Sequence, residues 1–119
     1  MNPFATSDRI LISKRPQDMR AGIQRLASVV AADFGAEPTD GALYCFVSRD
    51  CSKMKAIRFE DDGACLYYVK LAGGTFKWRF GDGGEASLEA SHSQLMLLLS
   101  GLDIDLLEKR APIAGKKLL

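Results

Sequence analysis

The sequence predicts one small α+β domain, built on an antiparallel, meander-like sheet of four to six strands. Short strand-like segments joined by tight turns fill residues 40–80, and helix-like segments lie on either side of them in the sequence. A chain of 119 residues fits one domain with a modest core. We expect residues 1–110 to form this domain and residues 111–119, which carry Pro112, Gly115 and Lys116-Lys117, to form a flexible C-terminal tail.

The first part of the chain predicts a strand and then an amphipathic helix. Residues 9–14 are strand-like and are followed by Pro16, which has no N–H group to donate to a strand ladder. Apolar residues then recur every three or four positions over residues 19–34, the period of one helix face. Asp18 is the expected N-cap of this helix, and Gly35 its expected end.

The central segments predict most of the sheet. Residues 43–47 are apolar on both faces, which is typical of a strand inside a sheet. Residues 54–60 and 64–71 are joined by an acidic turn. Residues 75–80 alternate between aromatic and basic side chains and follow Gly73-Gly74, a strong hairpin signal.

The last predicted elements are a short strand near residues 86–88 and a second helix. Ser91 and Gln94 have the spacing of a capping box, which opens a helix that continues to Gly101. Leucines lie nearly all round this helix, so we expect it to be buried on more than one side. It could also serve as a homodimer seam or protein docking surface, through Leu95, Leu97, Leu98 and Leu99.

Turn length decides which side chains share a face of the central sheet, because side chains alternate along a strand. A two-residue turn at Gly73-Gly74 would place Lys70 opposite Lys77. Like charges in opposite positions cost stability, which suggests an anionic partner. A three-residue acidic turn that ends at Gly63 buries more apolar surface than a two-residue turn and brings Arg58 to the same face.

The side chains on this predicted basic face suit nucleic acid, because Lys and Arg contact phosphates and an aromatic ring stacks on bases. A solvated face, or contact with an acidic protein surface, would explain the same pattern. The face consists of Arg58, Tyr68, Lys70, Lys77 and Arg79, with Lys55 and Arg20 at its margins. The residues expected in the core on the other side are Met19, Ile23, Leu26, Val30, Ile57, Phe59, Tyr67, Val69, Phe76 and Trp78.

No enzyme signature stands out. His92 is the only histidine, and the three cysteines contain no C-x-x-C pair, so neither a histidine-based triad nor a zinc site is predicted. The net charge of +1 indicates no partner by itself. Without a signal pattern or a membrane-length apolar run, and with an odd number of cysteines, the expectation is a cytoplasmic protein. We expect it to be non-catalytic, without cofactor, metal, small-molecule substrate or membrane contact.

The order of these motifs resembles the short accessory-protein family, called TnpB or second-open-reading-frame protein, of the insertion-sequence-66 elements of bacteria. The resemblance spans roughly residues 9–105. Val69 separates Tyr68 from Lys70, which are adjacent in the family pattern, so the predicted basic face is less basic than usual. The motifs are P-Q-D-M-R from Pro16, G-A-L-Y-C-F from Gly41, the acidic turn to Gly63, the segment from Tyr68 to Trp78, and Q-L followed by L-L-S-G-L-D from Gln94.

The resemblance implies a non-catalytic accessory role in DNA transposition. In such elements a much larger transposase carries out the recombination chemistry, so no catalytic residue is carried over to this chain. The implied partners are that transposase and DNA. A protein-interaction or homodimerisation module with no direct nucleic-acid contact is the alternative function, and the oligomeric state stays open.

Overall fold

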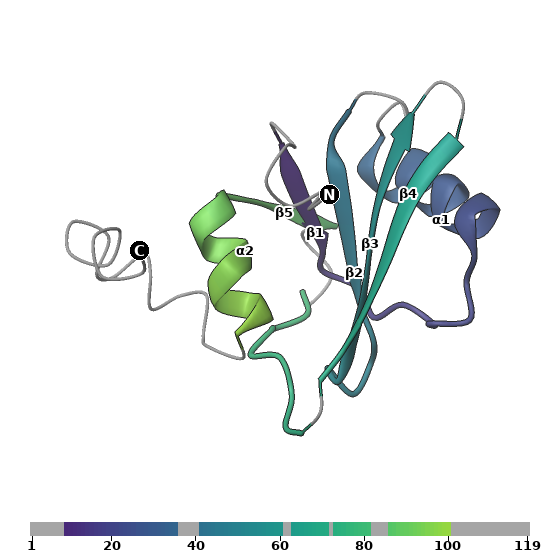
Figure 1. Ribbon diagram of the computed structural model, residues 1–119. Helices are drawn as coiled ribbons and strands as arrows, with labels where there is room; N and C mark the ends of the chain where they lie inside the picture. The colour runs from purple at the N-terminus through teal and green to yellow at the C-terminus, as the bar shows by residue number, and fades with distance from the viewer. Residues whose placement is uncertain (1–8, 36–40, 61–62, 72, 82–85, 101–119) are drawn as a thin grey trace.

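A five-stranded sheet runs through the centre of the computed structural model, with one helix against each face (Figure 1). The structure describes residues 9–35, 41–60, 63–71, 73–81 and 86–100. This arrangement confirms the predicted α+β class and strand number. The predicted tail at residues 111–119 lies outside the described residues.

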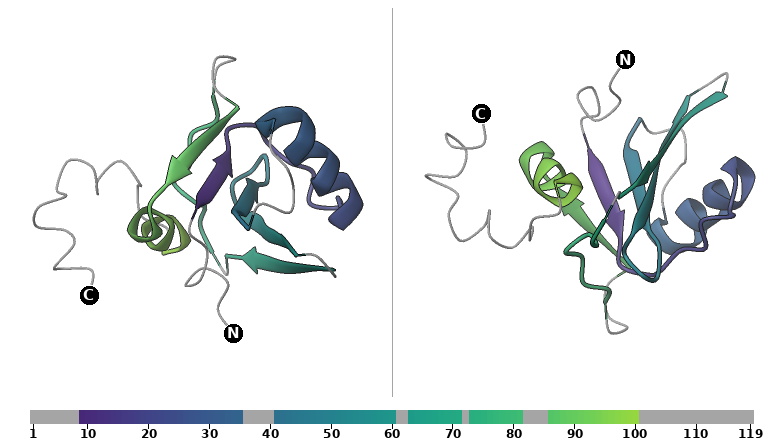
Figure 2. Two further views of the ribbon diagram at one scale, coloured as in Figure 1. Left: turned by 90° about the horizontal axis from the view of Figure 1, so that it is seen from above. Right: turned by 60° about the horizontal axis from the view of Figure 1, so that its bottom comes forward.

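The strands stand in the order β4-β3-β2-β1-β5, seen as a row in the left panel of Figure 2. Neighbouring strands are antiparallel except β1 and β2, which are parallel. The sheet is therefore mixed, and the predicted meander is found only in β2, β3 and β4. The strand bounds are Ile10–Ser13 (β1), Leu43–Val47 (β2), Lys53–Glu60 (β3), Gly63–Lys70 (β4) and Ser87–Ala90 (β5).

The parallel pair requires a crossover, and a helical segment supplies it. Helix α1 (Ile23–Val29) continues into a π-helical segment, η2 (Val30–Phe34). Gly35 ends the segment with a φ of 60°, as the sequence predicted. The prediction of Asp18 as N-cap is wrong, because Gly22 occupies that position. The Asp18 carboxylate instead accepts the backbone N–H of Arg20 at 2.9 Å, a local bond that competes with helix formation.

One apolar core, the α1 core, lies between the crossover and the sheet. Leu26 and Val30 are fully buried there. The ring of Phe34 stacks on that of Phe46, with 6.0 Å between ring centroids. Ile23 is 44 % exposed, so the prediction that it is buried is wrong. The sheet residues of this core are Leu11, Ala42, Tyr44, Phe46, Ile57 and Phe59.

A second core, the α2 core, fills the opposite face of the sheet. Helix α2 (His92–Leu99) and the extended residues 75–80 cover it. Side chains alternate along that segment as predicted: Phe76 and Trp78 are buried, whereas Lys77 and Arg79 are exposed. Phe76, Trp78, Leu95 and Leu98 pack here against Ile10, Ile12, Leu43, Cys45, Val47, Met54, Ala56 and Ala90.

Residues 75–80 do not form the predicted strand beside β4. The N–H of Phe76 bonds to the carbonyl of Cys51 at 2.6 Å, and the N–H of Gly81 bonds to the carbonyl of Lys14 at 2.8 Å. The Trp78 indole Nε1 donates to the carbonyl of Ser13 at 3.1 Å. The aromatic side chains thus draw the segment across the α2 face, and Lys70 is not opposite Lys77.

The turn between β3 and β4 also differs from the prediction. Glu60 lies opposite Gly63, so two residues, not three, form the turn. As a result Ile57 shares a face with Tyr68 instead of Tyr67. Ile57 is nevertheless buried, because this face is covered by α1. The prediction of a three-residue turn from apolar burial is wrong, because the two-residue turn also buries Ile57 and Phe59, against α1.

The capping box predicted for α2 is confirmed. The Ser91 hydroxyl accepts the N–H of Gln94 at 3.1 Å, and the Gln94 side chain accepts the N–H of Ser91 at 2.8 Å. We expect Ser91→Ala to lower the free energy of unfolding by about 1 kcal/mol, because one helix N–H loses its acceptor. Urea denaturation measures this change. Ser93→Ala is a matched control at an exposed neighbour, and an equal loss in the control would contradict the capping role.

Candidate nucleic-acid interface

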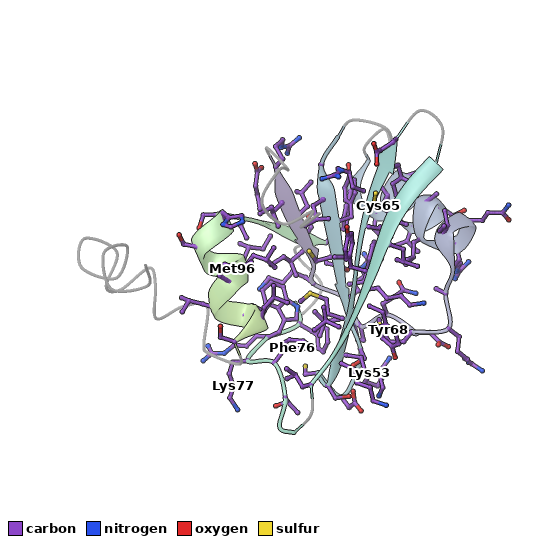
Figure 3. All side chains as sticks on the ribbon, viewed as in Figure 1. Lys53, Cys65, Tyr68, Phe76, Lys77 and Met96 are labelled. Atoms are coloured by element: carbon purple, nitrogen blue, oxygen red, sulfur yellow. The ribbon has the colours of Figure 1, made fainter. Side chains whose placement is uncertain are left out.

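The structure does not place the five residues of the predicted basic face together. Tyr68 and Lys70 lie on the α1 side of β4. Arg58 points to the opposite side, since it is the sequence neighbour of Ile57 and Phe59 in the α1 core. Lys77 and Arg79 lie on the extended segment over the α2 face. Figure 3 shows the separation, with Tyr68 and Lys53 on one side of the sheet and Lys77 on the other.

Tyr68 instead lies in an open groove of about 760 Å³ below α1. We call this the Tyr68 groove. Its walls come from the segment before α1, the β2–β3 turn and the end of β4. The lining residues are Pro16, Gln17, Asp18, Met19, Arg20, Ser48, Arg49, Asp50, Lys53 and Tyr68.

Tyr68 is an aromatic platform at this groove. Tyr68 is 54 % exposed, which is the largest exposed fraction among the described large hydrophobic residues. The Nζ atom of Lys55 lies 5.6 Å from the ring centroid and donates to the carbonyl of Ala21 at 2.7 Å. Lys55 thus ties the Tyr68 ring to the start of the α1 crossover. The structure thus brings Tyr68 and Lys55 together, and their role in binding stays a prediction.

Two lysines face each other beside this ring. Lys53 is the direct partner of Lys70 in the β3–β4 register, next to the Lys55–Tyr68 pair. The N–H of Leu71 bonds to the carbonyl of Ser52 at 3.0 Å. Because hydrogen-bonded and non-hydrogen-bonded pairs alternate, Lys53–Lys70 is a non-hydrogen-bonded pair, in which side chains lie closer together. The structure therefore has a like-charge pair, but with Lys53 in place of the predicted Lys77.

Arg20 reaches the groove in a tight pair with Asp18. Its Nη2 lies 2.7 Å from Asp18 Oδ2, and its Nε lies 3.1 Å from the same carboxylate. These bonds, with a smaller contribution from Lys55, lower the pKa of Asp18 to about 2. Asp18 is therefore ionised at neutral pH, and Arg20 offsets its charge.

The second groove carboxylate, Asp50, is held within the β2–β3 turn. It accepts the hydroxyl of Ser48 at 2.7 Å and the hydroxyl and N–H of Ser52 at 2.8 and 3.1 Å. The Ser48 bond is the largest cause that lowers the pKa of Asp50 to about 2. Lys53 Nζ lies 3.9 Å from this carboxylate, a loose exposed ion pair.

The turn predicts a pH dependence. The pKa of Asp50 in the folded state is below its ordinary value of 3.8, so its stabilising effect is present above about pH 4 and is lost as the pH falls toward 2. We expect carbon-13 NMR titration of the carboxyl group to give a midpoint near 2. Ser48→Ala should move it toward 3.8, whereas Ser28→Ala should not. An unchanged midpoint in Ser48→Ala would contradict this assignment.

Arg49 and Lys70 supply positive charge that the described residues do not neutralise. Both are exposed, and neither has an ion pair within the described part of the chain. Together with Lys53 and Lys55 they carry more positive charge than the carboxylates of Asp18 and Asp50 can neutralise. The groove is thus suited to an anion that also presents an aromatic or apolar surface.

Arg49 and Lys53 were absent from the sequence-predicted site. A two-residue β3–β4 turn would have placed Lys53 opposite Lys70, so the signal was present but depended on the turn length. Arg49 lies in a polar turn with no periodic pattern, and only the fold brings it to the groove. Arg20, by contrast, was predicted at the margin and does line the groove.

The leucines proposed as a docking surface are largely buried. Leu95 and Leu98 are fully buried and Leu97 is 6 % exposed, while Leu99 is half-buried. Within the described residues there is no group of three or more His, Cys, Asp or Glu side chains that could hold a metal ion. None of the described helices is both long enough and apolar enough to cross a membrane.

Comparisons with known proteins give this geometry a family context. The IS66 Orf2 like protein family matches residues 8–109. An uncharacterized protein of Sinorhizobium fredii, y4hO, is 36 % identical over 87 % of this chain and 88 % of its own length. A second one, y4jC, is 29 % identical over 80 % of each chain. No solved structure matches the chain. The chain belongs to the IS66 Orf2 like protein family.

Proposed function

We propose that this protein is a transposition accessory protein that binds nucleic acid through the Tyr68 groove. Membership of the IS66 Orf2 like family supports the association with transposition. The groove supports the nucleic-acid contact, since it combines clustered cations with an exposed ring. The larger transposase of the same element is a second proposed partner, on the strength of the family membership alone.

One observation carries the proposal: Lys53 and Lys70 are held directly opposite each other beside exposed Tyr68. Like charges in this position lower the stability of a strand pair. The loose ion pair with Asp50 offsets only part of that cost, because exposed ion pairs contribute little. A phosphate between the two ammonium groups would turn their repulsion into attraction for both.

The groove offers nucleic acid two kinds of contact. Lys53, Lys70 and Arg49 can neutralise backbone phosphates. The ring of Tyr68 can stack on a base, while Lys55 stays against the ring from the protein side. Stacking on an exposed ring requires an unpaired or unstacked base, so single-stranded or distorted DNA should bind best.

Substitution of Tyr68 tests this function. Tyr68→Ala should weaken binding to single-stranded oligonucleotides by between about fivefold and a hundredfold, as expected for the loss of 1–3 kcal/mol of stacking. Tyr68→Phe keeps the aromatic ring, so its affinity should stay within about twofold of that of the natural protein, a difference smaller than the stacking energy of one base. Fluorescence anisotropy with labelled strands from the ends of an insertion-sequence-66 element measures both. Equal binding by all three proteins would rule out Tyr68 as the platform.

A further inference from the structure

Strand β4 leaves one long edge of the sheet open. It has eight residues and stands at the end of the row of strands (Figure 2, left panel). No strand among the described residues pairs with its outer side. An unpaired edge presents free N–H and C=O groups that can pair with another strand.

Two independent hydrogen bonds show which β4 residues point their backbone groups outward. The N–H of Leu71 bonds to Ser52, and the N–H of Ser48 bonds to the carbonyl of Lys53 at 2.9 Å. Both place the even-numbered residues of β3 in hydrogen bonds with the odd-numbered residues of β4. The outward backbone groups of β4 therefore belong to Ala64, Leu66, Tyr68 and Lys70.

This edge carries few of the features that normally prevent strand pairing. Natural edge strands are shortened, or carry prolines, bulges or several charges. Strand β4 has no proline, pairs with β3 residue by residue without a bulge, and has a single charged residue, Lys70, at its end. Leu66 and Tyr68, both on the α1 face, are 37 % and 54 % exposed.

We propose that β4 pairs antiparallel with β4 of a second copy of this chain, which joins two five-stranded sheets into one. The residues whose backbone groups point outward must lie opposite the same kind of residue in the partner strand. The allowed registers are therefore related to one another by shifts of two residues. One of them places Leu66 opposite the partner's Tyr68 and Lys70 opposite the partner's Ala64. It forms two equivalent apolar–aromatic pairs about the two-fold axis and opposes no like charges.

The neighbouring registers are less favourable. A shift of two residues one way places Tyr68 opposite the partner's Tyr68, but it also places Leu66 opposite the partner's Lys70 in both copies. The same shift the other way places Tyr68 opposite the partner's Ala64, so neither ring gains an apolar partner of its own size. In the proposed register both Tyr68 grooves open on the same side of the joined sheet, because the two-fold axis is perpendicular to it.

A cysteine substitution tests both the dimer and its register. The proposed register places Cys65 opposite position 69 of the partner, in a non-hydrogen-bonded pair close enough for a disulfide. The V69C variant should therefore form a covalent dimer when treated with a mild oxidant. The oxidant is needed because joining the two thiols as a disulfide releases two electrons and two protons, and the oxidant accepts the electrons.

Two controls make the crosslink specific. V69C combined with Cys65→Ser should stay monomeric on a non-reducing gel. The natural chain should also form no covalent dimer on the same denaturing gel, because the two copies of Cys65 would be about 13 Å apart along the strands. A covalent dimer of the natural chain, or none from V69C, would overturn the proposed register.

Sedimentation equilibrium tests the association itself. The natural protein should have a mass near twice the 13.0 kDa of one chain. Leu66→Pro removes an outward N–H but no bond to β3, and edge strands tolerate proline there, so it should give a folded monomer. Leu66→Val should remain dimeric. A monomeric natural protein at every concentration would overturn the proposal whatever its DNA binding.

Discussion

Trp78→Ala should lower the free energy of unfolding by about 3–5 kcal/mol, the usual range for removal of a buried tryptophan. Trp78 is 6 % exposed and lies in the α2 core. It also joins a segment outside the sheet to β1, through the bond from Nε1 to the carbonyl of Ser13. The Lys14 ammonium group, 4.6 Å from the ring centroid, adds a cation–π contact.

Trp78→Phe separates these contributions. Phenylalanine keeps an aromatic ring in the core but cannot donate to Ser13, which is buried. We expect a smaller loss, about 1–3 kcal/mol, from an unsatisfied carbonyl and some lost volume. Urea denaturation of both variants measures the difference. A loss below about 1 kcal/mol for Trp78→Ala would mean that residues 75–80 are not anchored to the α2 face.

Neutralising the lysine pair should have opposite effects on stability and binding. Lys70→Gln removes a like charge opposite Lys53, so the free energy of unfolding should rise by a few tenths of a kcal/mol. The double variant Lys53→Gln/Lys70→Gln should lose roughly tenfold in affinity for DNA, because two phosphate contacts are removed. If the two lysines were only solvated and did not contact DNA, the variants would gain stability but keep their affinity for DNA, which would contradict the proposal.

Lys77→Gln/Arg79→Gln is the matched control for this double variant. It removes the same net charge from the exposed segment over the α2 face, and neither residue lines the Tyr68 groove. Its affinity for DNA should stay within about twofold of the natural protein, since no phosphate contact is lost. An equal loss in both double variants would indicate attraction by overall charge instead of contact at the groove.

Local sequence signals predicted the elements of this fold well. Three of these signals depend only on residues a few positions apart. They are the apolar period over residues 19–34, the helix end at Gly35 and the capping box at Ser91. The alternation from Phe76 to Arg79 likewise predicted which side chains are buried. It did not reveal that the segment crosses a face of the sheet, because side chains alternate along any extended chain, whether or not its backbone pairs with a neighbouring strand.

The errors in the predicted site trace to tertiary packing. Both faces of the sheet are covered, so a basic patch could not spread over one open face and lies where α1 leaves the end of β4 uncovered. The Gly73-Gly74 signal suggested a hairpin, but burial of Phe76 and Trp78 in the α2 core took priority. Tyr68, Lys70 and Lys55 still come together, because their positions in β3 and β4 do not depend on that hairpin. Arg20 reaches the same groove from the segment before α1.

The salt dependence of DNA binding tests the Tyr68 groove most directly. Each phosphate contact changes the slope of log K against log salt concentration by about −0.7 for single strands and −0.9 for duplex. The natural protein should show a steep negative slope. Lys53→Gln/Lys70→Gln should flatten it by about 1.4 on single strands, the sum of two contacts, while Lys77→Gln/Arg79→Gln leaves it unchanged. A flat slope for the natural protein, or the same change in both variants, would contradict nucleic-acid binding at this groove.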